Sequence, residues 1–213
     1  MAEEMQKKTA WVAKDLGAAS DEPIIVFDHV DMIFNIASEQ LNNLKEYFIK
    51  LVRRQLFFEE FKALKDVSFT IRRGEVYGVV GSNGSGKSTL GRLLNGALAP
   101  SAGRVSVDGL VVGEAASHDL ARLVGYVRQD PRNQIVSALV EDEVAFGPRN
   151  LGLERSDVDE RVSEALSACG IESLRGRMTT ELSGGQQQLL ALAGVLAMRP
   201  RYLVLDEAGS QLD

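Results

Sequence analysis

The chain has 213 residues, 45% hydrophobic and 25% charged, with 24 Lys and Arg against 30 Asp and Glu and a formal net charge of -6. These fractions are ordinary for a soluble globular protein, and the acidic balance argues against a protein that coats nucleic acid, so we expect no nucleic-acid partner. The single cysteine, Cys169, excludes an intrachain disulfide and a multi-cysteine metal site.

The N-terminal part is expected to begin with a flexible tail over residues 1–22, followed by a strand in the β-branched and aromatic run 24–34. Ser38 can cap a helix over roughly 39–56, whose apolar residues recur every three or four positions. This basic segment is either a surface helix packed on the domain or a helix that docks on a partner or a membrane. The longest apolar run, 189–198, is about half of the ~20 residues that a membrane span needs, so no integral membrane segment is expected.

Strand and helix patterns alternate along the rest of the chain. The run 202–207 is apolar up to its acidic end, which is typical of a parallel strand buried on both faces. This alternation predicts an α/β fold with a largely parallel sheet. Strands are predicted over 63–71, 76–80, 104–109, 123–127 and 202–207, and helices over 88–98, 156–170 and 186–198.

A glycine-rich loop carries the first chemical signal. Its sequence GSNGSGKS matches G-x-x-x-x-G-K-[ST] between a predicted strand and a predicted helix. Glycines let backbone N–H groups approach phosphates closely, and the helix that follows directs its positive end at the anion. Lys87 can reach the β- and γ-phosphates, and the Ser88 hydroxyl can ligate Mg²⁺. The residues assigned to the nucleotide are Gly81, Ser82, Asn83, Gly84, Ser85, Gly86, Lys87, Ser88 and Thr89.

Two acidic residues follow the apolar strand near the end of the chain. In doubly wound sheets, ligands bind at the carboxyl ends of the strands. Asp206 is placed there to hold Mg²⁺, commonly through water, and Glu207 to orient or deprotonate an attacking water. A solvated acidic pair is the alternative, and the glycine loop in the same chain argues against it.

The segment LSGGQ opens a predicted helix. Ser183 is a natural N-cap, and Gly184 and Gly185 expose backbone N–H groups, which makes a second anion-binding helix end. One nucleotide needs one cradle per chain, so a second cradle is explained if it completes the site of a neighbouring chain. Gln129 lies between the glycine loop and LSGGQ.

In this order, the glycine loop, Gln129, LSGGQ and the strand ending in Asp206-Glu207 resemble the ATP-binding cassette of ABC transporters. The resemblance implies a P-loop NTPase fold in one cassette over 23–213. It also implies a mostly parallel core sheet, an antiparallel N-terminal part, a helical insert near 38–60 and a helical subdomain near 130–185.

The resemblance further implies ATP and Mg²⁺ as cofactors and ATP hydrolysis coupled to transport. Two cassettes, identical or different, sandwich ATP head to tail, so that 81–89 of one faces Ser183, Gly184, Gly185 and Gln186 of the other. Gln129 is implied as a metal and water ligand, and 210–213 as a loop that contacts the other cassette. The cassette binds a transmembrane subunit and is peripheral at the cytoplasmic face of the membrane. Among Phe57, Phe58 and Phe61 we favour Phe58 for stacking on adenine, with core packing as the equal alternative.

Two parts of the chain resemble different subfamilies. From about residue 90 onward, QDPRNQI followed by EDEVAFGP resembles the ATPases of energy-coupling-factor importers. Residues 24–75 resemble ATPases that export polysaccharide or teichoic acid. The leading interpretation is an importer ATPase, with polysaccharide export as the runner-up. A soluble cassette protein of repair, chromosome organisation or translation and an inactive fragment are the remaining alternatives.

The chain ends at Asp213, inside the implied cross-dimer loop. The resemblance implies that further strands and helices follow and carry a histidine that touches the γ-phosphate. The two histidines present, His29 and His118, both precede LSGGQ and cannot be that residue. We therefore expect a C-terminally truncated cassette.

We expect the 213-residue chain to release phosphate more slowly, by about 100-fold or more, than a version grafted with the C-terminal part of a related cassette, because one positioning contact on the γ-phosphate is worth that much. Steady-state phosphate release from the two purified proteins measures the difference. Comparable turnover would contradict the expectation.

Overall fold

The computed structural model describes residues 22–37 and 58–207. The described residues divide into two compact units, one within 1–90 and 99–112 and one within 91–98 and 113–213. The predicted helix over 39–56 and the predicted loop 210–213 lie outside the described residues, as does the predicted tail up to residue 21.

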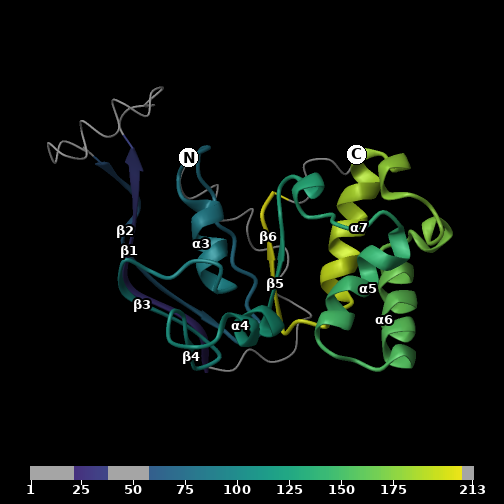
Figure 1. Cartoon of the computed structure of the whole chain (residues 1–213). Helices are drawn as coiled ribbons and strands as arrows, with labels where there is room; N and C mark the ends of the chain where they lie inside the picture. The colour runs from purple at the N-terminus through teal and green to yellow at the C-terminus, as the bar shows by residue number, and fades with distance from the viewer. Residues whose placement is uncertain (1–21, 38–57, 208–213) are drawn as a thin grey trace, which may run out of the picture. The chain divides into compact units, whose positions relative to one another are not determined.

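The first unit contains a four-stranded antiparallel sheet in the order β2-β1-β3-β4 (Figure 1). The strand predicted over 24–34 is confirmed, and it is longer than expected. Residues 58–60, expected in the helical insert, instead extend β2, because they pair with residues 35–37 of β1. The strands are β1 (Pro23–Ala37), β2 (Phe58–Arg72), β3 (Ala102–Val107) and β4 (Leu110–Val111).

Apolar side chains of β1, β2 and β3 form the buried side of this sheet. Phe27 is almost fully buried, and its ring stacks on Phe69 with a centroid distance of 4.5 Å. Tyr77 stacks on the same Phe69 ring at 5.1 Å. The other buried apolar side chains of these three strands are Ile24, Ile25, Val30, Met32, Leu64, Ile71, Val105 and Val107.

Residues 76–80 were predicted as a strand, and this prediction is wrong for the structure described here. No residue of this segment pairs with a strand among the described residues, and Val80 is 96% exposed. A β-strand exists only where a neighbour shares its backbone hydrogen bonds, so the β-branched composition alone does not produce one. The Tyr77–Phe69 stack holds the segment on the first unit instead.

A bulge in β1 faces a strained residue of β2. His29 and Asp66 both have positive φ, 48° and 50°, and the β1–β2 register shifts between Phe27 and Val30. The His29 Nδ1 atom lies 2.6 Å from Asp66 Oδ1. Gly103 is required beside the bulge, because a Cβ there would lie 2.1 Å from the His29 carbonyl oxygen. The Asp66 carboxylate raises the pKa of the His29 imidazole above its usual 6.5.

The second unit combines two parallel strands with helices. β5 and β6 pair in parallel, which together with the helices confirms the predicted α/β class. The predicted strands near 123–127 and 202–207 are confirmed with slightly different ends. Its elements are α4 (Ser117–Leu123), β5 (Val124–Val127), η1 (Pro131–Asn133), α5 (Val140–Asn150), α6 (Arg155–Ala168), η2 (Glu172–Leu174), η3 (Thr179–Glu181), α7 (Gly184–Leu196) and β6 (Tyr202–Leu205). Helix α3 (Lys87–Leu94) belongs in part to each unit.

Helices α5, α6 and α7 pack side by side around an apolar core (Figure 1). Val144 of α5, Leu166 of α6 and Leu190 of α7 are fully buried in it. The predicted end of α6 at Gly170 is confirmed: this glycine has φ 67°, its N–H donates to the Ser167 carbonyl, and the next N–H donates to the Leu166 carbonyl.

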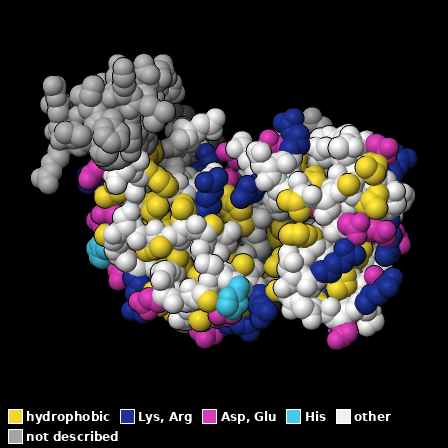
Figure 2. Space-filling model, viewed as in Figure 1, with side chains coloured by type: hydrophobic (Ala, Val, Ile, Leu, Met, Phe, Trp, Pro, Cys, Tyr) yellow, Lys and Arg dark blue, Asp and Glu magenta, His cyan; other side chains and the backbone are white. Residues whose placement is uncertain are grey.

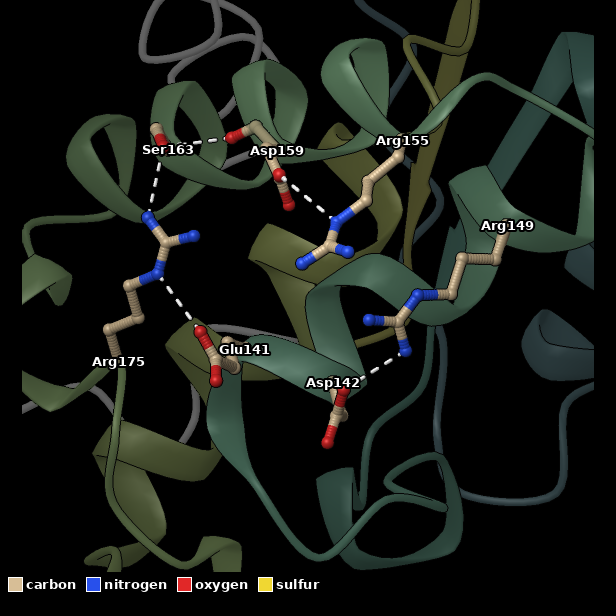
Figure 3. Close-up of polar contacts among 7 residues, drawn as sticks. All are labelled: Glu141, Asp142, Arg149, Arg155, Asp159, Ser163 and Arg175. Carbon is tan, nitrogen blue, oxygen red and sulfur yellow. Dashed lines mark hydrogen bonds and ion pairs between the residues drawn. The ribbon is translucent and has the colours of Figure 1, made fainter.

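Arg175 connects α5 to α6 through its guanidinium (Figure 3). Its Nε donates to Glu141 Oε2 at 3.1 Å and its Nη1 to Ser163 Oγ at 3.0 Å. The Arg175 carbonyl also accepts from the Glu141 N–H at 3.1 Å, which satisfies a donor at the start of α5, where no side chain caps the helix. Charges of both signs are interspersed on this part of the surface (Figure 2).

Strand β6 was predicted to be buried on both faces, and this is wrong for the described residues. Leu203 is 41% exposed and Leu205 is 56% exposed, while Tyr202 and Val204 are half-buried. The alternation shows one covered face and one open face. A continuous apolar run therefore identifies the strand but not what covers each of its sides.

The His29–Asp66 pair predicts a pH dependence. Because the folded-state pKa of His29 is raised, the contribution of the pair to stability is full below the unfolded value of 6.5 and is lost as the pH rises through the folded value. NMR titration of the imidazole should give a midpoint above 6.5 that falls towards it in Asp66→Asn. An unchanged midpoint in that variant would contradict the pairing.

Candidate functional site

The glycine loop lies in the first unit and is organised around Lys87. The Lys87 Nζ donates to the carbonyl oxygens of Gly81 at 2.7 Å and Ser82 at 3.2 Å, so the ammonium lies over the loop that precedes it. A backbone turn from Ser85 N–H to the Ser82 carbonyl, 3.1 Å, curls the loop. The predicted helix follows directly, because α3 begins at Lys87.

Two glycines of the loop are required by its geometry. Gly84 and Gly86 have φ of 82° and 93°, a region that side chains rarely adopt. A Cβ on Gly86 would lie 2.6 Å from the Ala63 carbonyl oxygen and 2.9 Å from Leu64 Cδ2, so the loop packs directly on β2. The positive end of an eight-residue helix, a lysine and an exposed glycine loop together suit a phosphate group.

The acidic pair lies in the second unit, at the carboxyl ends of β5 and β6. Val127 pairs with Leu205, and the Asp206 N–H continues the ladder by donating to the Val127 carbonyl at 3.0 Å. The Tyr126 hydroxyl donates to Asp206 Oδ2 at 2.7 Å. Burial and the Asp206 carboxylate raise the pKa of Tyr126 to about 12, against an opposing effect of Arg92, so this phenol is a hydrogen-bond donor at neutral pH.

Gln129 and Glu207 meet at the same end of the strand pair. The Gln129 Nε2 donates to Glu207 Oε2 at 2.7 Å, although the two residues are 78 positions apart. Glu207 has φ of 50°, a strained conformation of the kind that clusters at functional sites. The structure therefore brings together two residues that the sequence selected separately, and it leaves the Gln129 amide oxygen available as a ligand.

The LSGGQ segment begins helix α7, as predicted. Ser183 is the N-cap: its Oγ accepts from the Gln186 N–H at 3.3 Å, and Gln186 Oε1 accepts from the Ser183 N–H at 3.0 Å. This reciprocal capping box leaves the N–H groups of Gly184, which is exposed, and Gly185, which is half-buried, in the first turn of the helix. One turn later the buried Gln188 donates from Nε2 to the Arg128 carbonyl at 3.4 Å, next to Gln129.

The loop that follows Gln129 is anchored by a buried carboxylate. Glu143 of α5 is only 8% exposed, and its Oε2 accepts from the N–H groups of Val136 at 2.9 Å and Ser137 at 2.7 Å. The same loop pairs with residues 178–179, through a Leu139–Met178 bridge and a Thr179 N–H donating to the Ala138 carbonyl. Val136 is 67% exposed and Met178 is 41% exposed, so a fixed loop presents apolar side chains to solvent.

Several site residues were not predicted from the sequence. Tyr126, Glu143 and Gln188 hold predicted residues or their loop in place, and only Tyr126 carried a possible signal, since a parallel register would have placed it beside the acidic pair. Phe58 begins β2 opposite Ala37, and Phe61 is 47% exposed. Phe57 lies outside the described residues, and the adenine role of Phe58 stays a prediction.

Comparison with known proteins shows the family to which the chain belongs. A profile described as "ABC transporter" matches residues 64–210. The energy-coupling factor transporter ATP-binding protein EcfA of Syntrophomonas wolfei is 50% identical over 156 residues, which is 73% of this chain and 57% of that protein. The chain thus spans little more than half the length of this relative.

Solved structures agree with that assignment. The structure of cbiO1 from Clostridium perfringens, described as part of the ABC transporter complex cbiONQ, has a TM-score of 0.69 and 35% identity, and the match covers 91% of this chain and 68% of that one. A dimeric bacterial ABC transporter cassette has a TM-score of 0.71 and 25% identity, covering 89% and 76%. The chain belongs to the ABC transporter family.

Lys87→Ala should weaken ATP binding tenfold to more than a hundredfold, because a charge-assisted contact worth about 1.5–3 kcal/mol is lost. Fluorescent-nucleotide titration measures the affinity. Lys65→Ala is the matched control, since it removes the same charge from an exposed position on β2. Equal affinity of the Lys87 variant and the control would contradict the assignment of the loop.

Proposed function

We propose that this chain is the ATP-binding and ATP-hydrolysing cassette of an energy-coupling-factor importer, which couples hydrolysis to transport across a membrane. The observation that carries the proposal is the Gln129–Glu207 hydrogen bond at the end of a parallel strand pair, in a chain that is 50% identical over 156 residues to an EcfA protein. A carboxylate oriented by an amide beside a second acidic residue suits water activation rather than simple binding.

The nucleotide is held by the glycine loop, 81–89. Lys87 neutralises charge on the β- and γ-phosphates, and backbone N–H groups of the loop cradle them. The hydroxyl of Ser88, the amide oxygen of Gln129 and the carboxylate of Asp206 are the ligands proposed for Mg²⁺, because each offers a hard oxygen of the kind that this ion prefers. When bound, Mg²⁺ supplies charge neutralisation on the phosphates, and Glu207 accepts the proton of the attacking water.

Two cassettes complete the site. The first turn of α7, Ser183 to Gln186, is a second anion-binding helix end, and it is assigned to the γ-phosphate bound by the other subunit. The dimeric bacterial cassette with a TM-score of 0.71 supports a dimer of this kind. Homodimer and heterodimer are both compatible with the described residues.

The loop 135–139 is the proposed contact with a transmembrane subunit. It is fixed by Glu143 and by its pairing with residues 178–179, and both Val136 of the loop and Met178 of the paired segment are exposed. Among the described residues, no helix has the length and apolarity to cross a bilayer. A peripheral position at the cytoplasmic face, on a membrane partner, agrees with the placement of cassettes of this type. The boundary of one cassette over 23–213 is part of the same proposal.

Export of polysaccharide or teichoic acid is the second candidate, and it rests on the sequence of residues 24–75 alone. Residues 38–57, which make up most of the insert that distinguishes this subfamily, lie outside the described residues. Co-purification of the chain with the membrane subunit of an energy-coupling-factor importer, against that of a polysaccharide exporter, separates the two candidates.

Glu207→Gln should leave ATP binding intact and stop phosphate release, because the amide has the same volume but cannot act as a base. The variant should therefore accumulate an ATP-bound dimer, measured by size-exclusion chromatography with ATP in the buffer. Phosphate release is measured in the grafted version described above. Glu114→Gln, on an exposed residue, is the control. Hydrolysis by the Glu207 variant at the rate of its parent would refute the role of this carboxylate.

A further inference from the structure

Tyr126 is a residue of the second unit to which the mechanism above gives no role. It lies on β5 opposite Val204, and the parallel register carries its side chain towards Asp206, which directly follows β6. There its hydroxyl donates to Asp206 Oδ2 at 2.7 Å. Among the described residues, this hydrogen bond connects the Asp206 carboxylate to the side chain of the neighbouring strand.

The ring of Tyr126 is held in place by a glycine of α3. A Cβ on Gly91 would lie 2.6 Å from the ring atom Cε2 and 3.2 Å from Val204 Cγ1. The absence of a side chain at this position gives the phenol room to lie against the helix. The hydroxyl is therefore delivered to Asp206 by a ring with little freedom to move, packed between a helix and a strand.

We propose that Tyr126 is a positioning residue for Asp206, which it holds in the orientation that binds Mg²⁺ together with the nucleotide. The inference rests on the proposed function, because it assumes that Asp206 takes part in metal binding. The hydrogen bond engages one carboxylate oxygen, Oδ2, and thereby fixes the rotation of the side chain before the metal arrives. A carboxylate without this hydrogen bond would rotate freely and would lose that freedom when the metal binds, which lowers the affinity for the metal.

The effect should appear in metal affinity and not in nucleotide affinity. Partners that orient a metal-binding side chain typically contribute 10–100-fold to metal affinity. Because Asp206 is expected to hold Mg²⁺ through water, the lower end of this range applies. Tyr126→Phe should therefore weaken metal binding by about tenfold. This variant removes the hydroxyl and keeps the ring that packs on Gly91.

The test is a Mn²⁺ titration, followed by electron paramagnetic resonance, of the 213-residue chain with a non-hydrolysable ATP analogue. Tyr202→Phe is the matched control, because it removes a hydroxyl from β6 opposite Val124, at the other end of the strand pair. We expect about tenfold weaker Mn²⁺ binding for Tyr126→Phe alone, with the affinity for the analogue in the absence of metal unchanged. Equal Mn²⁺ affinity in all three proteins, or an equal loss in both variants, overturns the inference.

A second comparison assigns the effect to Asp206. In an Asp206→Asn background, Tyr126→Phe should cause no further loss of Mn²⁺ affinity, because the two changes act through one interaction. A full additional loss overturns the inference, since the hydroxyl would then act elsewhere. If the wild-type chain does not bind the analogue, the proposed function and this inference are overturned together. If the wild-type chain binds the analogue and Tyr126→Phe leaves the Mn²⁺ affinity unchanged, this inference alone is overturned.

Discussion

The parallel pairing of β5 with β6 is the constraint on which the chemistry of the second unit depends. The register places Val127 opposite Leu205, and the Asp206 N–H adds one more rung to the ladder by donating to Val127. Residues that leave the two strands at this end are thereby brought together although about 80 positions separate them in the sequence. The contacts from Tyr126 to Asp206 and from Gln129 to Glu207 are both consequences of this register, because a shift of one residue would turn each side chain to the opposite face.

Helix α7 is tied to this strand pair at both of its ends. Near its start, Gln188 donates to the Arg128 carbonyl, and near its end Val195 packs on β5. Gly125 allows that packing, since a Cβ there would lie 2.4 Å from Val195 Cγ1 and 2.8 Å from Pro200 Cγ. The capped LSGGQ turn and the acidic pair therefore belong to one packed assembly. The close fit between helix and strand keeps the distance between the turn and the acidic pair nearly constant.

The sequence predicts the structure correctly where the signal is local. The capping box of Ser183, the glycine that ends α6 and the strand–loop–helix order around Lys87 follow from residues within a few positions of one another. Predictions from the sequence are wrong where a distant neighbour decides the structure of a segment. The β-branched segment 76–80 has no strand partner among the described residues, and Leu203 and Leu205 are exposed on a strand expected to be covered. Tyr126 was missed for the same reason, because its role depends on a register that no single segment encodes.

The connection between Gln129 and α5 is stiff rather than flexible, and this bears on how a contact at the loop reaches the acidic pair. Its first turn is closed by Arg128 N–H donating to Gln134 Oε1 at 2.9 Å, and Asp130 caps η1 by accepting from the Arg132 N–H. Its far end is held by the buried carboxylate of Glu143. Hydrogen bonds at both ends restrict the conformations open to this segment, which favours transfer of a displacement at its exposed end to Gln129. Since Gln129 donates to Glu207, the orientation of that carboxylate depends on where this segment lies. The proposed docking loop and the proposed catalytic base are joined by a short stretch of chain up to Gln129 and by one hydrogen bond from Gln129 to Glu207.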